Sequence, residues 1–395
     1  MGFHYRHIFS SSSVLWWIKA AAGLGPGGVG STAYAKCSRS IATSSILATV
    51  NTQTRRRAAA LLEVLGVYLA GTVLENKIEQ LLVHWRLIST TNPFDLMTDH
   101  ATNAELLVAS RQLLLALILM YSSYFLLILP INWWYRRRGR AAYGLTRAGR
   151  SWKALILAGL ATAVLTQWPV LIHTLVDAIH PLGAMAPWRQ AFFNMSWRRW
   201  QFWLLAGIMS YAVVRVVEEL IFRGYYQRRL AEDWGDGPAI IGTACFFTFA
   251  HTQYLIANAY NVTMIASLLC LALGLGVVFA WTRSLIPSMI AHAIINVPMT
   301  PLWQGGLLVV FAIGGFFAWR GGLAVVRQVF AKTNVAACAA LAVAQTLYVI
   351  EAHRINAMTQ VAIGMLAVAL GLEAIESPKG PARRGCFNID CNRVI

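Results

Sequence analysis

Between Gln112 and Trp134 the chain reads QLLLALILMYSSYFLLILPINWW, a stretch without a single charged side chain. As an α-helix it exceeds the ~20 residues needed to cross about 30 Å of membrane hydrocarbon. Comparable apolar segments recur at about 58–82, 153–175, 200–222, 239–258, 262–282, 285–303, 305–319, 334–350 and 357–375. These runs are too long and too uniformly apolar for the alternating strands of a membrane barrel. The sequence therefore predicts an all-α, polytopic transmembrane helical bundle of about eight to ten spanning helices.

The overall composition agrees with a membrane protein. Of the 395 residues, 57% are hydrophobic and only 12% are charged, whereas soluble domains carry about 25% charged residues. The six cysteines are scattered, and Cys245, Cys270 and Cys338 lie inside apolar runs. We interpret these three as small buried hydrophobic residues, which argues against a secreted disulfide scaffold.

The net charge of +17 is concentrated in two stretches. Residues 1–62 and residues 135–153 each contain seven Lys/Arg and no acidic residue. Neither stretch carries a nucleic-acid recognition motif, so we expect no nucleic-acid partner. Basic loops beside apolar spans mark the cytosolic side of a membrane. The distribution therefore predicts a cytosolic N-terminus, and the mixed-charge loop at 83–111 is expected on the outer side.

Ionisable side chains inside spanning helices are costly and are therefore functional candidates. Three groups of polar residues fall within the predicted spans. The first is Glu218-Glu219 followed by Arg223, the second is Phe247 followed by His251, and the third is His292 followed by Asn296.

Helical spacing indicates how these residues face one another. Glu219 and Arg223 are four apart and can pair on one helix face, and Arg215 could share Glu219 from the preceding turn. Glu218 lies about 100° further round the helix and can point elsewhere. Each group alone has a structural explanation, such as an ion-pair network or a histidine that bridges helices. Their joint placement at one predicted depth, roughly 10–20 Å below the cytosolic surface at about 1.5 Å per residue, favours a functional site.

At these residues the sequence resembles the CAAX-processing and bacteriocin-immunity (CPBP, or Abi) family of intramembrane proteases. The family pattern is Glu-Glu-x-x-x-Arg, then Phe-x-x-x-His, then His-x-x-x-Asn/Asp/Ser, on successive helices. Every motif position is filled, and the resemblance covers residues 200–303.

The resemblance implies hydrolysis of a peptide bond within the membrane, with water as the nucleophile. By that likeness Glu218 would be the general base, His251 would orient the water, and His292 and Asn296 would donate hydrogen bonds to the oxyanion. Glu219, Arg223 and Phe247 would hold the shape of the site. The expected substrate is a membrane-embedded or lipid-modified peptide, with the lipid bilayer as surroundings.

A zinc ion is the alternative to a metal-free reaction. Glu218, His251 and His292 could ligate Zn²⁺ and leave one position for water. The sequence contains no His-Glu-x-x-His motif, and Arg223 close to the glutamates disfavours a dication. We therefore expect a glutamate mechanism with no cofactor.

The resemblance also suggests a division of the chain. Residues 1–57 form a basic Ser/Gly-rich extension, expected to be disordered; a transit peptide or a start codon set too far upstream would also explain it. Residues 58–198 are N-terminal transmembrane helices, 199–303 a CPBP-like catalytic core, 304–376 C-terminal transmembrane helices, and 377–395 a cytosolic tail. The expected location is the bacterial inner (plasma) membrane, with an organelle membrane as the alternative.

Two other functions remain open at this point. Chains of Glu, His and Asn side chains also serve as relays in proton-coupled transporters. A non-catalytic membrane scaffold or immunity protein could keep the same helices. An internal repeat would favour a transporter, and none is visible between the first five and the last five predicted spans.

Overall fold

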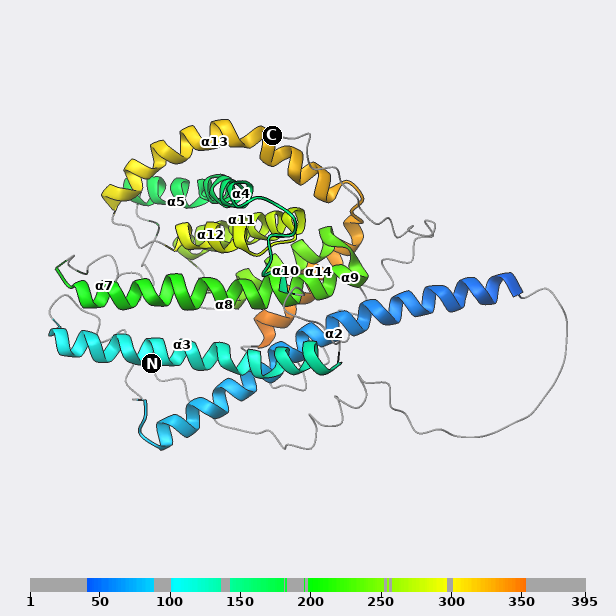
Figure 1. The fold of residues 1–395 in the computed structure, drawn as a ribbon, viewed down its shortest axis with the longest axis horizontal. Coiled ribbons are helices and arrows are strands. Elements are labelled where there is room, and N and C mark those ends of the chain that lie inside the picture. The colour runs from blue at the N-terminus through cyan, green and yellow to red at the C-terminus, as the bar shows by residue number, and fades with distance from the viewer. Residues whose placement is uncertain are drawn as a thin grey trace.

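The structure is a computed structural model, and it describes residues 41–88, 101–135, 143–180, 182, 195, 198–251, 254–255, 258–296 and 301–352. Every regular element in these ranges is a helix, which confirms the predicted all-α fold (Figure 1). The elements are α2 (Ile41–His84), α3 (Asn103–Pro130), η2 (Ile131–Tyr135), α4 (Trp152–Thr166), α5 (Trp168–Ile179), α7 (Trp200–Gly207), η4 (Ile208–Val214), α8 (Arg215–Glu219), η5 (Leu220–Gln227), α9 (Arg228–Trp234), α10 (Asp236–Ala250), α11 (Ala259–Thr282), α12 (Ile286–Ile295), α13 (Pro301–Phe330) and α14 (Val335–Ala352).

Within the described ranges, 5 helices are long and apolar enough to cross a membrane. They are Thr52–His84, Asn103–Trp133, Trp152–Val170, Ala259–Thr282 and Val309–Phe330. Three shorter apolar helices accompany them: Asp236–Ala250, Ile286–Ile295 and Val335–Val349. The chain is thus a polytopic bundle. The total of about eight to ten spans stays a prediction, because residues 357–375 and the tail at 377–395 lie outside the described residues.

Two helices begin earlier than the apolar pattern predicted. Helix α2 begins at Ile41, so the extension expected to be disordered is helical from that residue onward; residues 41–57 contain neither Gly nor Pro. Helix α3 begins at Asn103, inside the expected outer loop. There Thr102 and Glu105 form a capping box, which satisfies free backbone N–H groups at the helix start.

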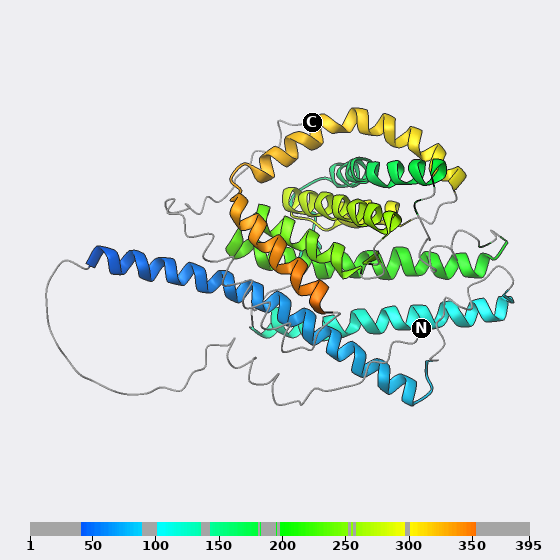
Figure 2. The same ribbon diagram turned by 180° about the vertical axis from the view of Figure 1, so that it is seen from behind.

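Helix α3 and the long helix made of α7, η4, α8, η5 and α9 run side by side in the same direction (Figure 1). At their first turns Arg199 Nη1 donates to Asn103 Oδ1 at 2.6 Å. Helix α2 runs the opposite way and crosses both, as the view from behind also shows (Figure 2). Residues that are equally far from the starts of α3 and of the long helix therefore lie at the same level in the bundle.

The loops at the other end of the bundle are tied together by basic residues and backbone contacts. Arg283 makes a two-pronged ion pair with Asp236, with N–O distances of 2.9 and 2.7 Å. Leu285 N donates to Gly144 O at 2.8 Å. The described basic loops thus gather at one end, as the charge pattern predicted. A cytosolic location for that end stays a prediction.

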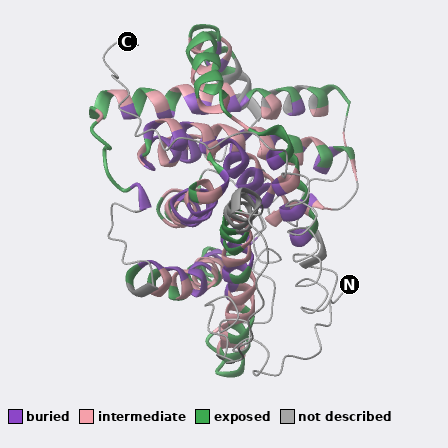
Figure 3. Ribbon diagram, turned by 90° about the vertical axis from the view of Figure 1, so that its right-hand side faces the viewer, coloured by how far each residue is buried: buried purple, intermediate pink, exposed green. Residues whose placement is uncertain are grey.

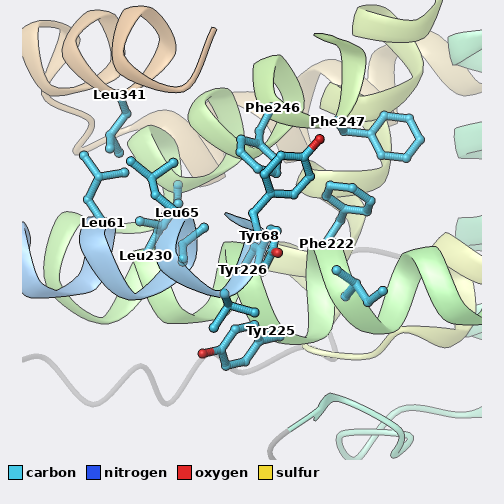
Figure 4. Close-up of a cluster of buried hydrophobic side chains, with 14 of the residues drawn as sticks. Leu61, Leu65, Tyr68, Phe222, Tyr225, Tyr226, Leu230, Phe246, Phe247 and Leu341 are labelled. Carbon is cyan, nitrogen blue, oxygen red and sulfur yellow. The ribbon is translucent and has the colours of Figure 1, made fainter. Parts of the chain in front are cut away.

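The main core joins α2, η5, α9, α10 and α14 (Figure 4). Tyr68 of α2 packs edge-on against Phe246 of α10, with ring centroids 4.7 Å apart. Buried residues lie in the middle of the bundle and exposed ones on its outer faces (Figure 3). On α13, Phe316 and Phe317 are 72% and 77% exposed. Apolar side chains facing outward in this way suit contact with lipid.

Gly224 in η5 lets the neighbouring segments approach the long helix closely. A Cβ atom here would lie 3.1 Å from Tyr143 O and 3.3 Å from Leu285 Cδ1. Leu285 directly precedes α12. The absence of a side chain at Gly224, about one turn after Glu219, therefore lets the start of α12 pack directly against the long helix.

Candidate active site

Glu218 and Glu219 lie at the end of α8, between the π-helical segments η4 and η5. Their side chains are enclosed, since Glu218 is 8% exposed and Glu219 is 0% exposed. Wider π-helical turns are rare and occur most often at functional sites. The two adjacent glutamates thus sit in the most irregular part of a long helix inside an apolar bundle.

Glu219 is bound by a cation on its own helix. Arg223 Nη1 donates to Glu219 Oε1 at 3.0 Å, as the four-residue spacing predicted, and both side chains are buried. Arg223 Nη2 also donates to Ala272 O of α11 at 3.3 Å. Arg215, the other predicted partner of Glu219, makes no ion pair with it in the described part of the chain.

His292 of α12 contacts both glutamates. Its Nδ1 lies 2.9 Å from Glu219 Oε1, within hydrogen-bond distance, and its Nε2 lies 3.7 Å from Glu218 Oε2. The ring is 3% exposed. Because an ionised carboxylate can only accept, Nδ1 carries the proton when it bonds Glu219. The predicted association of the first and third motifs is therefore present.

Phe247 of α10 links the remaining motif to this cluster. Arg223 Cζ lies 4.7 Å from the Phe247 ring centroid, a cation–π contact. The rings of His251 and His292 lie 4.7 Å and 6.2 Å from the same ring, centroid to centroid. Phe247 thus packs against a member of each motif, consistent with its predicted place in the framework of the site.

His251 and Asn296 occupy the C-terminal ends of α10 and α12, and both are partly exposed. His251 Nδ1 donates to Phe247 O at 2.8 Å, which leaves Nε2 as an acceptor in the neutral ring. Asn296 N donates to His292 O at 3.1 Å, so the two residues remain stacked on one helix face. His251 is therefore linked to the cluster through Phe247 and Asn296 through its own helix, and neither side chain bonds a glutamate in the described part of the chain.

Tyr121 of α3 is a member of this cluster that the sequence interpretation missed. Its hydroxyl donates to Glu218 Oε1 at 2.6 Å, across 97 residues of sequence, and the side chain is 6% exposed. The available signal was the Tyr-Ser-Ser-Tyr run at 121–124 in the middle of an apolar span. That run does not indicate which residue of another helix the hydroxyl would reach.

The arrangement does not fit a zinc site. No group of three His, Cys, Asp or Glu side chains within the described ranges is placed to hold a metal ion. Glu219 is bound to Arg223 and His292.

These contacts lie within one continuous segment of the chain, apart from Tyr121. Residues 199–298 match a family model described as Rce1-like: Type II CAAX prenyl endopeptidase Rce1-like. The matched segment contains all three motifs and agrees with the resemblance found at 200–303. No curated protein and no solved structure matched the chain.

At the level of the family, the Rce1-like segment supports a CAAX-type intramembrane protease. Together with the helices that can span a membrane, it identifies an integral membrane protein. The match leaves out α2 and α3, and therefore Tyr121. The match covers the segment as a whole, and the roles of its individual residues are taken up below as proposals.

Proposed function

We propose that the protein is an intramembrane endopeptidase that uses Glu218 to activate a water molecule for peptide hydrolysis. The observation that carries the proposal is the enclosed contact between Glu218 and His292, within a segment that matches a protease family. A buried carboxylate beside a ring nitrogen has the groups required for general base catalysis.

The proposed reaction begins with a water that donates a hydrogen bond to Glu218. As the water oxygen forms a bond to the scissile carbonyl carbon, Glu218 takes one proton and the carbonyl oxygen becomes an oxyanion. When the C–N bond breaks, Glu218 gives that proton to the leaving nitrogen. A positioned base of this kind typically contributes 10²–10⁴-fold to a rate.

His292 and Asn296 are proposed as donors to the oxyanion. Because His292 Nδ1 bonds Glu219, Nε2 also carries a proton only when the ring is an imidazolium. In that form Nε2 can donate to the oxyanion, and the Asn296 amide can donate whatever the charge of the ring.

His251 is proposed to orient the water. Its Nδ1 bond to Phe247 O leaves the Nε2 lone pair as an acceptor. Water held by two acceptors presents its own lone pair to the carbonyl carbon. This role needs no metal ion, and the poor fit of the side chains to zinc supports a metal-free reaction.

The proposed substrate is a membrane-embedded or lipid-modified peptide. A site built from helices of an apolar bundle favours peptides that partition into the bilayer, and the family description points to prenylated C-a-a-X peptides as the first probe. We propose the bacterial plasma membrane as the location, with an organelle membrane as the alternative that cell fractionation distinguishes.

The test uses the full chain, purified in detergent and supplied with a fluorogenic farnesylated peptide ending in a C-a-a-X sequence. We expect cleavage by the wild type in the presence of a chelator. Glu218→Gln should lower kcat by about 10³-fold or more, since it removes the base while keeping the size of the side chain. Cleavage at the wild-type rate by this variant would favour a non-catalytic scaffold. Loss of activity with chelator and its return with Zn²⁺ would overturn the metal-free mechanism.

A further inference from the structure

Tyr121 binds the proposed base from outside the segment that matches the protease family. Its hydroxyl lies 2.6 Å from Glu218 Oε1, in the range of strong hydrogen bonds to ionised acceptors. The other carboxylate oxygen, Oε2, faces His292 Nε2 at 3.7 Å. One oxygen of the base is thus occupied by the phenol, and the other faces the proposed reaction site.

The two adjacent glutamates have different partners, and the difference assigns their roles. Glu219 is bound by the Arg223 cation and by His292 Nδ1. Glu218 receives its short hydrogen bond from a neutral phenol. Glu219 is thus tied into the charged framework of the site, whereas the phenol fixes the direction of the Glu218 side chain and leaves Oε2 facing His292.

Helix α3 holds Tyr121 in place through the next turn. Tyr124 OH lies 3.1 Å from Thr72 Oγ1 of α2. Gly71 lets the two helices approach, since a Cβ atom there would lie 2.6 Å from Tyr124 Cδ1. The parallel run of α3 beside the long helix then brings residue 121 level with residue 218. The hydroxyl of Tyr121 is therefore supplied by a helix whose position is fixed independently of the glutamates.

We propose that Tyr121 is a positioning residue for the catalytic base, holding Oε1 of Glu218 so that Oε2 faces the water and His292. The inference rests on the proposed function of Glu218. It extends the active site to α3, so that the matched segment is incomplete without the N-terminal helices. A hydrogen bond to a charged group is worth more than one between neutral groups.

The experiment compares Tyr121→Phe with the matched control Tyr348→Phe, using the farnesylated C-a-a-X peptide. Both changes remove one hydroxyl that donates a hydrogen bond from a buried tyrosine, and the Tyr348 hydroxyl of α14 donates to Leu65 O at 3.1 Å. We expect Tyr121→Phe to lower kcat about tenfold or more with KM within about twofold, because alignment of the base matters in the transition state. The control should keep both constants near the wild-type values. A kcat for Tyr121→Phe within twofold of the wild type, or a change in KM alone, would overturn the proposal.

A second measurement keeps the proposal testable when no probe is cleaved. Unfolding midpoints of Tyr121→Phe, Glu218→Met and the double variant form a thermodynamic cycle; methionine is used because glutamine would keep an amide oxygen that accepts from the Tyr121 hydroxyl. We expect the two changes to be non-additive, since each removes the same contact. If the changes in unfolding midpoint are additive, the proposal is overturned, whatever peptidase activity the variants show. Absence of cleavage by the wild type counts against the proposed function alone, and the cycle then decides whether Tyr121 holds Glu218.

Discussion

The helices that match the protease family and the α2–α3 pair use their polar side chains differently. In the matched segment, polar groups bind one another, as in the contacts of Glu219 with Arg223 and His292. In α2 and α3, besides the Thr72–Tyr124 bond between the two helices, polar side chains reach across to the matched segment. Tyr121 binds Glu218, and Glu63 binds Arg229 of α9.

This difference separates the reactive groups from the groups that support them. The matched segment contains the carboxylates and imidazoles, and three short motifs are enough to recognise it. The α2–α3 pair contributes single side chains whose value depends on where a neighbouring helix lies. Its contribution is therefore visible in the structure and has no motif in the sequence.

The largest effect we expect is on stability, from Glu219→Gln. The change leaves the buried Arg223 without its ionic partner and weakens the bond to His292. Breaking one side of a buried ion pair costs about 3–5 kcal/mol. The free energy of unfolding in detergent should fall by about that amount, which a denaturant titration measures.

Glu218→Gln is the matched control for Glu219→Gln. It is one residue away and also buried, but its hydrogen-bond donor is the neutral Tyr121. We expect it to remain close to wild-type stability while it loses activity. Equal destabilisation by the two variants would contradict the division of roles between the two glutamates.

Sequence alone predicted the parts of the site that depend on spacing within one helix. The pairs Glu219–Arg223 and His292–Asn296 are four residues apart, and helix geometry places such residues on one face. The apolar runs predicted the all-α fold because about 20 apolar residues must span the hydrocarbon. The family motifs then indicated His251 and Phe247. These residues lie on another helix, so spacing along α8 could not predict them.

The rest depended on contacts between helices far apart in the chain. Tyr121 and Glu218 meet because α3 lies parallel to the long helix, and periodicity within a helix carries no information on its neighbours. Nothing in the sequence places Glu63 against the long helix, yet it accepts hydrogen bonds from Tyr225 and Arg229. The two π-helical segments around the glutamates likewise have no sequence pattern of their own.

An intermediate effect on stability is expected from Gly71→Ala, which tests how closely α3 packs against α2. The new Cβ would lie 2.6 Å from the Tyr124 ring, so the ring and α3 must shift. Overpacking of this kind costs about 1–3 kcal/mol, and kcat should fall with it because Tyr121 is one turn away. Gly66→Ala on the same helix is the control, since nothing lies within 4 Å of its added Cβ. That variant should be neutral or more stable, because alanine favours the helix; equal unfolding midpoints for both variants would contradict close α2–α3 packing.

The smallest effect is expected from Glu63→Gln, which tests the other contact of the N-terminal helices. Glu63 Oε2 accepts from Arg229 Nε at 2.9 Å, but Arg229 Nη1 also lies 2.7 Å from Asp233 Oδ2. Because the cation keeps a second carboxylate and glutamine keeps an acceptor for Tyr225, the loss should be about 1 kcal/mol of unfolding free energy. Glu79→Gln, an exposed change on the same helix, should leave the midpoint unchanged. The turnover number of folded Glu63→Gln should match the wild type, because this contact lies two turns or more beyond the glutamates. A kcat that fell as far as that of Tyr121→Phe would mean that the Glu63–Arg229 contact also positions the catalytic groups, and its assignment as a purely stabilising contact would then be wrong.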